Sequence, residues 1–92
     1  MPQLNLSKET KSVRLQLTIE NNDYNAYSAE ILNADGEIIS RSKSLKTQRT
    51  TVVTTISANS LKSGDYIVKL YGQSADGASE SVASYSFRVV RK

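Results

Sequence analysis

The sequence predicts an all-β domain built as a two-layered sandwich of seven strands, on three observations. Residues 13–19 alternate strictly between apolar and polar side chains, which indicates a strand with one buried face. Asp-Gly pairs at 35–36 and 76–77 each separate two apolar runs, a pattern typical of β-hairpins. Residues 61–66 have the spacing Leu-x-x-Gly-x-Tyr of a tyrosine corner, in which the ring packs in the core and the hydroxyl bonds to backbone a few residues upstream.

The strands follow one another with no convincing helical period between them. Residues 3–7 alternate weakly and predict an edge strand, although whether Leu4 and Leu6 pair into the sheet stays open, and residues 8–12 form a polar connector. The corner falls between the fifth and sixth strands, where a sandwich of the immunoglobulin or fibronectin-III-like type has it. A single domain is expected over residues 1–92, since this length supports one modest core. The other strands are expected at residues 13–19, 24–33, 37–42, 50–57, 66–73 and 82–90.

Alternation also predicts which side chains point into the core. In residues 50–57 the inner positions are Val52, Thr54 and Ile56, and we expect Ile56 to be the deepest. The other expected inner residues are Val13, Leu15, Leu17, Ile19, Tyr27, Ala29, Ile31, Tyr66, Val68, Leu70, Tyr85, Phe87 and Val89.

The composition argues against an enzyme. The chain contains no histidine or cysteine, so it lacks a familiar general base at neutral pH, an activated thiol, and imidazole or thiolate ligands for a metal. It also lacks tryptophan, the commonest stacking platform for sugars, and no serine-lysine pair occurs in a helix or elbow context. We therefore expect no catalytic residue, no cofactor and no metal.

Three carboxylates could suggest a calcium site or a glycosidase pair: Asp65, Asp76 and Glu80. Residues 76–80 offer too few oxygen ligands around their glycine for a calcium loop. A glycosidase pair needs a cleft and usually aromatic subsites. Structural or solubility roles are favoured, with Asp76 assigned to its turn.

Residues 41–49 contain four basic side chains and no acidic one. They indicate either a phosphate or acidic-surface site, or a solvated loop whose Leu45 packs under the sandwich. Nucleic-acid binders usually add aromatic or glycine-rich elements, or a recognition helix, and this stretch has none of these. We favour the solvated loop and expect no nucleic-acid partner, in keeping with the small net charge of +3.

The best-defined local motif is structural, and the residues that follow it are the candidates for binding. Leu61, Gly64 and Tyr66 are the expected corner. Ile67 and Tyr71 have the opposite parity to Tyr66, so both should leave the core face. Together they form an exposed apolar patch that contacts a protein partner, or they pack under a long loop, and both interpretations stay open.

The ends of the chain bear on its cellular location. No apolar run approaches the roughly 18 residues of a membrane span, and the first residues lack the features of a signal peptide. We expect a cytoplasmic protein or a domain excised from a longer chain. We favour excision, because Met1 resembles an added initiator and the chain stops directly after its last strand-like run.

The folding motifs also carry a family resemblance. A Tyr/Ala/hydrophobic strand leads to Ala-Asp-Gly, then to a Leu-x-x-Gly-Asp-Tyr corner and a closing Tyr-x-Phe-x-Val. This succession resembles the C-terminal β-sandwich domain of bacterial zinc-finger anti-sigma-factor-like membrane proteins, especially from acidobacteria. The resemblance implies an extracytoplasmic, periplasmic-side sensory or interaction domain of a membrane-anchored parent protein. The matching residues are Tyr27, Ala29, Glu30, Ile31, Leu32, Ala34, Asp35, Gly36, Leu61, Gly64, Asp65, Tyr66, Leu70, Gly72, Gly77, Glu80, Tyr85, Phe87, Arg88 and Val89.

The leading hypothesis is therefore a non-enzymatic interaction or sensor domain of a bacterial envelope protein, binding another protein. The alternative is a structural spacer or adhesion module of fibronectin-III type in a secreted protein. An immunoglobulin-fold protease inhibitor is disfavoured, because the chain lacks protruding loops rich in glycine, proline and aromatic residues.

Overall fold

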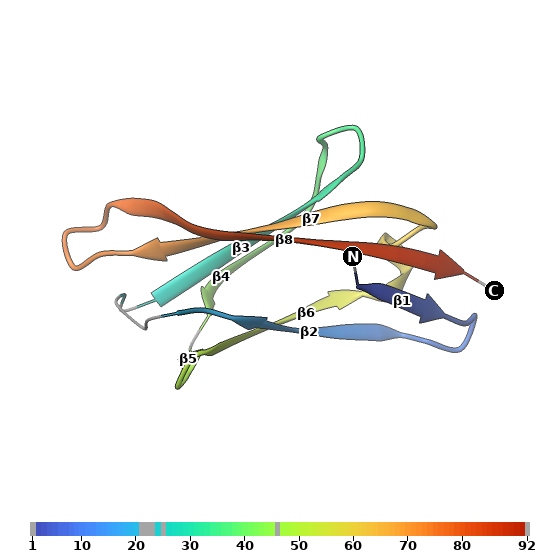
Figure 1. Ribbon diagram of the computed structural model, residues 1–92, viewed down its shortest axis with the longest axis horizontal. Helices are drawn as coiled ribbons and strands as arrows, with labels where there is room; N and C mark the ends of the chain where they lie inside the picture. The colour runs from blue at the N-terminus through green and yellow to red at the C-terminus, as the bar shows by residue number, and fades with distance from the viewer. Residues whose placement is uncertain (1, 21–23, 25, 46, 92) are drawn as a thin grey trace.

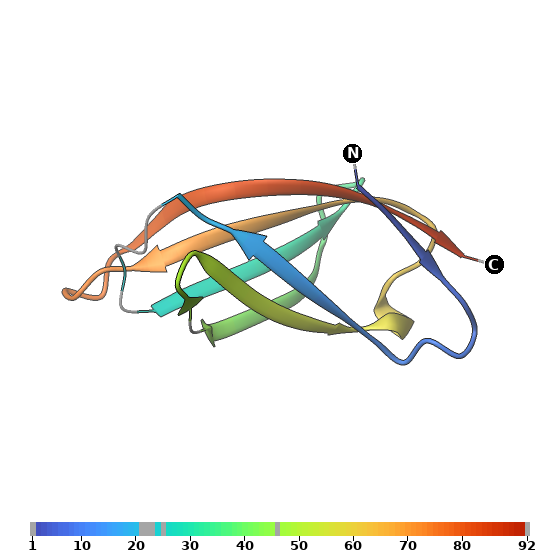
Figure 2. The ribbon, with the colours of Figure 1, turned by 60° about the horizontal axis from the view of Figure 1, so that its bottom comes forward.

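The computed structural model describes residues 2–20, 24, 26–45 and 47–91. Within these ranges the chain forms eight strands in two sheets that pack face to face (Figure 1, Figure 2). A single 3₁₀ turn, η1 (Ala58–Ser60), is the helical element of this part of the chain. The strands are β1 (Gln3–Leu6), β2 (Ser12–Thr18), β3 (Ala26–Asn33), β4 (Ile38–Leu45), β5 (Thr47–Gln48), β6 (Thr51–Ser57), β7 (Gly64–Gln73) and β8 (Ser79–Arg91).

The two sheets have different sizes. The larger has the strand order β1-β8-β7-β3-β4 and the smaller the order β2-β6-β5. All neighbouring strands are antiparallel except β1 and β8, which run parallel. This arrangement confirms the predicted all-β sandwich, and β1 is the edge strand expected near the start of the chain. The seven predicted strands are present, and the two-residue β5 is an additional one.

The strand predicted at residues 37–42 is present as β4, which continues to Leu45. The prediction of a solvated loop over residues 41–49 is therefore wrong for Arg41–Leu45. The strand extends because β3 is long enough to pair with it, with Tyr27 opposite Leu45 and Glu30 opposite Arg41. Leu45 is half-buried and packs against the core, as expected. Lys46 lies outside the described residues.

Both predicted Asp-Gly hairpins are present and have the same geometry. The N–H of Asn33 donates to the carbonyl of Glu37, and the N–H of Gly36 donates back to the carbonyl of Asn33. Ser74, Gly77 and Ala78 repeat this pattern in the second hairpin. Gly36 and Gly77 have φ of 82° and 88°, the left-handed region that such three-residue loops require at this position.

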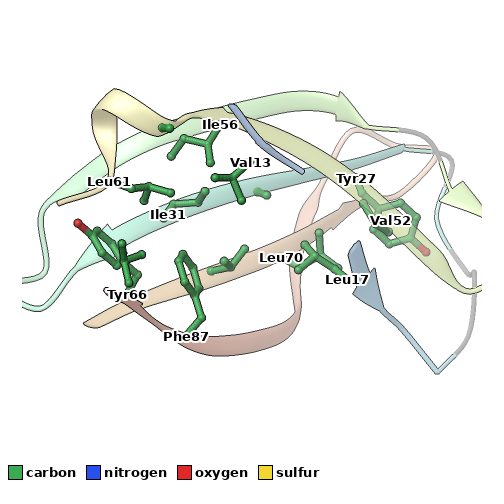
Figure 3. Packing of buried hydrophobic residues seen from close by; sticks show 14 of the residues in the cluster. Val13, Leu17, Tyr27, Ile31, Val52, Ile56, Leu61, Tyr66, Leu70 and Phe87 are labelled. Atoms are coloured by element: carbon green, nitrogen blue, oxygen red, sulfur yellow. The ribbon is translucent and has the colours of Figure 1, made fainter. Parts of the chain in front are cut away.

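The core lies between the sheets and is formed mainly by alternate residues of β2, β3, β6, β7 and β8 (Figure 3). Val52 and Leu70 are fully buried, and Tyr27 is buried to about the same degree. Within β6 the prediction that Ile56 lies deepest is wrong, because Val52 is 0% exposed and Ile56 is 4% exposed. Thr54 is buried as well, and its hydroxyl donates to that of Ser42 across the sandwich at 2.9 Å.

Candidate interaction surface

The residues predicted to form the corner lie together at one end of the sandwich. Leu61 is fully buried directly after η1, and Gly64 begins β7 with φ of 150°. The Tyr66 hydroxyl donates to the carbonyl of Lys62 at 2.8 Å, and its ring stacks on Phe87 with centroids 5.4 Å apart. This is the geometry of a tyrosine corner, so the Tyr66 side chain is occupied within the fold.

Arg91 reinforces the same end of the molecule. Its guanidinium donates to the carbonyls of Leu61 at 2.9 Å, Ser7 at 3.4 Å and Ala58, and its backbone N–H donates to the hydroxyl of Ser63 at 3.1 Å. One side chain on the last strand thereby satisfies three carbonyls, two from the turn at residues 58–61 and one from the connector after β1. No local pattern predicts this role, because it depends on which segments the end of β8 lies beside.

The outer face of β7 carries Ile67 and Tyr71, the two residues that the sequence analysis predicts as partner contacts. Ile67 is 42% exposed, Lys69 is exposed and Tyr71 is half-buried. Lys69 comes between Ile67 and Tyr71 along the strand, so the two predicted contact residues share a face and have different neighbours. Two adjacent regions result, one apolar and one polar.

The apolar region is a row of three side chains across neighbouring strands. Leu32 of β3 pairs with Ile38 of β4 on one side and with Ile67 of β7 on the other. Ile38 and Ile67 are each 42% exposed, and they are the exposed large hydrophobic residues of the described chain. We call Ile38, Leu32 and Ile67 the apolar row. Leu32 and Ile67 of this row line a depression of about 320 Å³, together with Asp65 and Lys69.

The polar region surrounds Tyr71. Glu30 is paired with Arg41, whose Nε lies 3.0 Å from the Glu30 Oε2, and both line a shallow depression of about 330 Å³ together with Tyr71 and Lys43. Desolvation raises the pKa of the Tyr71 hydroxyl above its ordinary value, and a hydrogen bond with Glu30 adds to the rise. We call Glu30, Arg41, Lys43 and Tyr71 the polar cluster.

The three carboxylates considered from the sequence are each engaged in a separate local contact. Asp65 accepts from Arg88, with Nε 2.7 Å from Oδ1, and this contact lowers the pKa of Asp65. Asp76 accepts from the Ser74 hydroxyl and, at 3.1 Å, from the Ala78 N–H inside its hairpin. Glu80 accepts from the Tyr24 hydroxyl at 2.6 Å.

Neither a metal centre nor a membrane span emerges from the described part of the chain. Its acidic residues do not gather into a group of three or more potential metal ligands. It likewise contains no helix with the length and apolar character needed to cross a membrane.

The sequence alone did not predict that Ile67 and Tyr71 have as neighbours Leu32, Ile38, Glu30 and Arg41. The Asp35-Gly36 hairpin predicts only that β3 and β4 are paired, because strands pair outward from the turn. That β7 lies on the other side of β3 could not be read from local spacing.

Comparison with known proteins adds a family and a fold. Residues 10–82 match the family described as the secretion system C-terminal sorting domain. No curated protein matches the chain. The crystal structure of CopC from Methylosinus trichosporium OB3b superposes with a TM-score of 0.54 at 24% identity, covering 99% of this chain and 86% of CopC.

A second structural neighbour is the NK cell receptor Nkp44, described as a triggering partner in natural cytotoxicity. It superposes with a TM-score of 0.63 at 13% identity, covering 99% of this chain and 97% of the receptor. At these identities both structures support the immunoglobulin-like sandwich and the fold alone. The resemblance to anti-sigma-factor-like proteins is tested by none of these matches and stays a prediction.

Proposed function

The chain belongs to the family of secretion system C-terminal sorting domains, and from this premise we propose that it is the sorting module of a secreted protein. The module acts as a folded, non-enzymatic signal that a protein of the secretion machinery binds. This function is a form of the secreted-protein module that the sequence suggested as an alternative.

The observation that carries the proposal is the extent of the family match. Residues 10–82 run from the connector before β2 into β8 and include both hairpin turns and the corner at 61–66. A match of this extent includes most of the strands of the sandwich and the turns that connect them. It therefore supports recognition of a folded domain rather than of a short linear segment.

The outer face of the larger sheet is the surface we assign to the machinery. The apolar row offers two side chains that are each 42% exposed, and the polar cluster beside it offers a tyrosine and a charge pair. An apolar centre with aromatic and arginine neighbours is the composition of a protein-binding patch. The expectation of a protein partner and no nucleic acid is retained.

The test is a fusion of the 92-residue chain to the C-terminus of a reporter enzyme, expressed in a bacterium that has the corresponding secretion system. We expect the reporter outside the cell, and inside it when the secretion system is deleted. Ile67→Glu should reduce export while leaving the thermal midpoint of the purified domain unchanged. Thr55→Glu is the matched control, since Thr55 of β6 is exposed on the outer face of the smaller sheet, away from the apolar row.

Export that is independent of the secretion system would refute the proposal. Retention of the wild-type fusion inside the cell would favour the alternative, a periplasmic-side regulatory domain of the anti-sigma-factor-like type. That alternative further requires a membrane segment and a zinc-binding segment upstream in the full-length protein.

A further inference from the structure

The edges of the two sheets differ in how they are protected against pairing with another strand. In the larger sheet, β4 carries Arg41 and Lys43 and pairs with β3 through two register shifts. At the opposite edge β1 has only four residues and follows Pro2, which has no N–H to donate. Charges, irregular pairing, short strands and proline are all features that discourage edge-to-edge association.

The remaining edges show similar features, with one exception. The part of β8 that extends beyond β1 contains a register shift opposite Leu70 and Tyr71. In the smaller sheet, β5 has two residues and is followed by Arg49 with a positive φ of 60°. The exception is β2, which has seven residues, no proline, one charged side chain and an unbroken register with β6.

The hydrogen bonds of β2 show which of its backbone N–H and C=O groups face the open edge. The N–H of Ile19 donates to the carbonyl of Thr50, and the carbonyl of Lys11 accepts from the N–H of Ala58, so odd-numbered residues bond toward β6. Even-numbered residues therefore present their N–H and C=O groups to the open edge. The hydroxyl of Tyr85 donates to the carbonyl of Thr18 from that side, as this direction requires.

The open edge of β2 is complementary to itself in one antiparallel register. With a two-fold axis at Leu15, Arg14 of one copy lies opposite Gln16 of the other, and Ser12 lies opposite Thr18. All four are even-numbered, so each Arg14–Gln16 pair exchanges two backbone hydrogen bonds. The carbonyl of Thr18 already accepts from the Tyr85 hydroxyl, so each Ser12–Thr18 pair adds one bond, from the Thr18 N–H to the Ser12 carbonyl. A shift of two residues in either direction loses a pair, and one of these shifts places Arg14 opposite Arg14, which is unfavourable.

Side chains on the inner face fit the same register. Leu15 meets Leu15 at the axis, and Val13 meets Leu17 on each side. Leu15 is half-buried, whereas Val13 and Leu17 are buried. Pairing through β2 would cover the remaining exposed part of Leu15.

We propose that two copies of this domain associate through β2 in this register, forming a continuous six-stranded sheet in the order β5-β6-β2-β2-β6-β5. The interface is a strand addition, in which main-chain hydrogen bonds supply affinity and the Arg14–Gln16 pairs set the register. It lies on the smaller sheet and leaves the apolar row and the polar cluster of the larger sheet uncovered.

The test is sedimentation equilibrium of the 92-residue chain from micromolar to millimolar concentration. We expect a monomer–dimer equilibrium. Gln16→Lys places two like-charge pairs across the interface and should raise the dimer dissociation constant about tenfold. Adding Arg14→Glu converts both pairs to Glu–Lys pairs and should return the constant to within about threefold of the wild-type value.

Ser84→Lys is the control, because it adds the same charge on the larger sheet, where Ser84 of β8 is exposed beyond the reach of β1. It should leave the equilibrium unchanged, and circular dichroism should show that each variant remains folded. A wild-type chain that stays monomeric at millimolar concentration overturns the proposal. A dimer that resists Gln16→Lys, or one that Ser84→Lys dissociates, overturns it too.

Discussion

The residues of β7 point alternately to two faces of the sheet, and the structure buries one face and exposes the other. On the inner face, Tyr66, Val68 and Leu70 are 6%, 1% and 0% exposed, and they pack among the side chains of the smaller sheet. On the outer face, Ile67 is 42% exposed, and no second layer covers this face within the described residues. The strand thus contributes one set of residues to the core and leaves Ile67 of the other set exposed.

This difference implies that stability and recognition are separable by substitution within a single strand. The inner residues lose packing on truncation, whereas the outer residues lose only partial contacts with their cross-strand neighbours. Pairs of variants on the two faces of β7 therefore test the division directly, because each pair shares its backbone environment.

The largest difference is expected between Leu70→Ala and Ile67→Ala. Truncation of the fully buried Leu70 should cost about 2–5 kcal/mol of unfolding free energy, since it removes apolar contacts and leaves a cavity. Truncation of Ile67 should change stability by about 0.5 kcal/mol or less, as at most exposed positions. Urea denaturation measures both values. Equal losses would contradict the division between the two faces.

A smaller effect is expected from the two tyrosine hydroxyls. Tyr66→Phe removes the hydrogen bond to the Lys62 carbonyl and should cost on the order of 1–2 kcal/mol, because the Tyr66 side chain is buried. Tyr71→Phe is the matched control on the outer face and should cost no more than about 0.5 kcal/mol. An unchanged denaturation midpoint for Tyr66→Phe would contradict a stabilising role for the corner.

The same division explains what could be predicted from the sequence. The inner face of β7, the two hairpins and the corner spacing depend on residues close together in the chain, and alternation or a glycine marks each of them. The end of β4 depends on how far β3 continues opposite it. For that reason the pattern of residues 41–45 predicts a solvated loop where the structure has a strand.

The neighbours on the outer face depend on strand order, which local patterns do not contain. Ile67 meets Leu32 only because β7 pairs with β3, although 35 residues separate them in the chain. Arg91 likewise reaches Ser7 only because β8 ends beside the start of the chain. Residues that are brought together by topology and not by a turn or an alternation therefore could not be identified beforehand.

Charge removal along residues 41–49 should have less effect than loss of the Tyr66 hydroxyl. Replacing Arg41, Lys43, Lys46 and Arg49 together by neutral residues should leave unfolding free energy within about 1 kcal/mol, because exposed ion pairs contribute little. The Arg41 side chain is 63% exposed in its pair with Glu30, and Lys46 is outside the described residues. Salt-dependent, micromolar DNA binding by the wild-type chain would instead indicate a nucleic-acid site in this stretch.

The smallest expected effect is a change in titration on the outer face itself. A hydrogen bond from Arg88 holds the pKa of Asp65 below its ordinary value of 3.8. A lowered pKa in the folded state means that the ionised carboxylate favours folding above about pH 4, and this contribution is lost as the pH falls through the folded-state pKa.

Arg88→Gln should move the Asp65 midpoint upward, toward 3.8, as followed by the carboxyl ¹³C shift in an NMR titration. Glu37→Gln, at an exposed carboxylate of the first hairpin, should leave that midpoint in place. If the Asp65 midpoint does not change in Arg88→Gln, the Asp65–Arg88 pair does not persist in solution. Both charges would then be free to pair with a partner's charges.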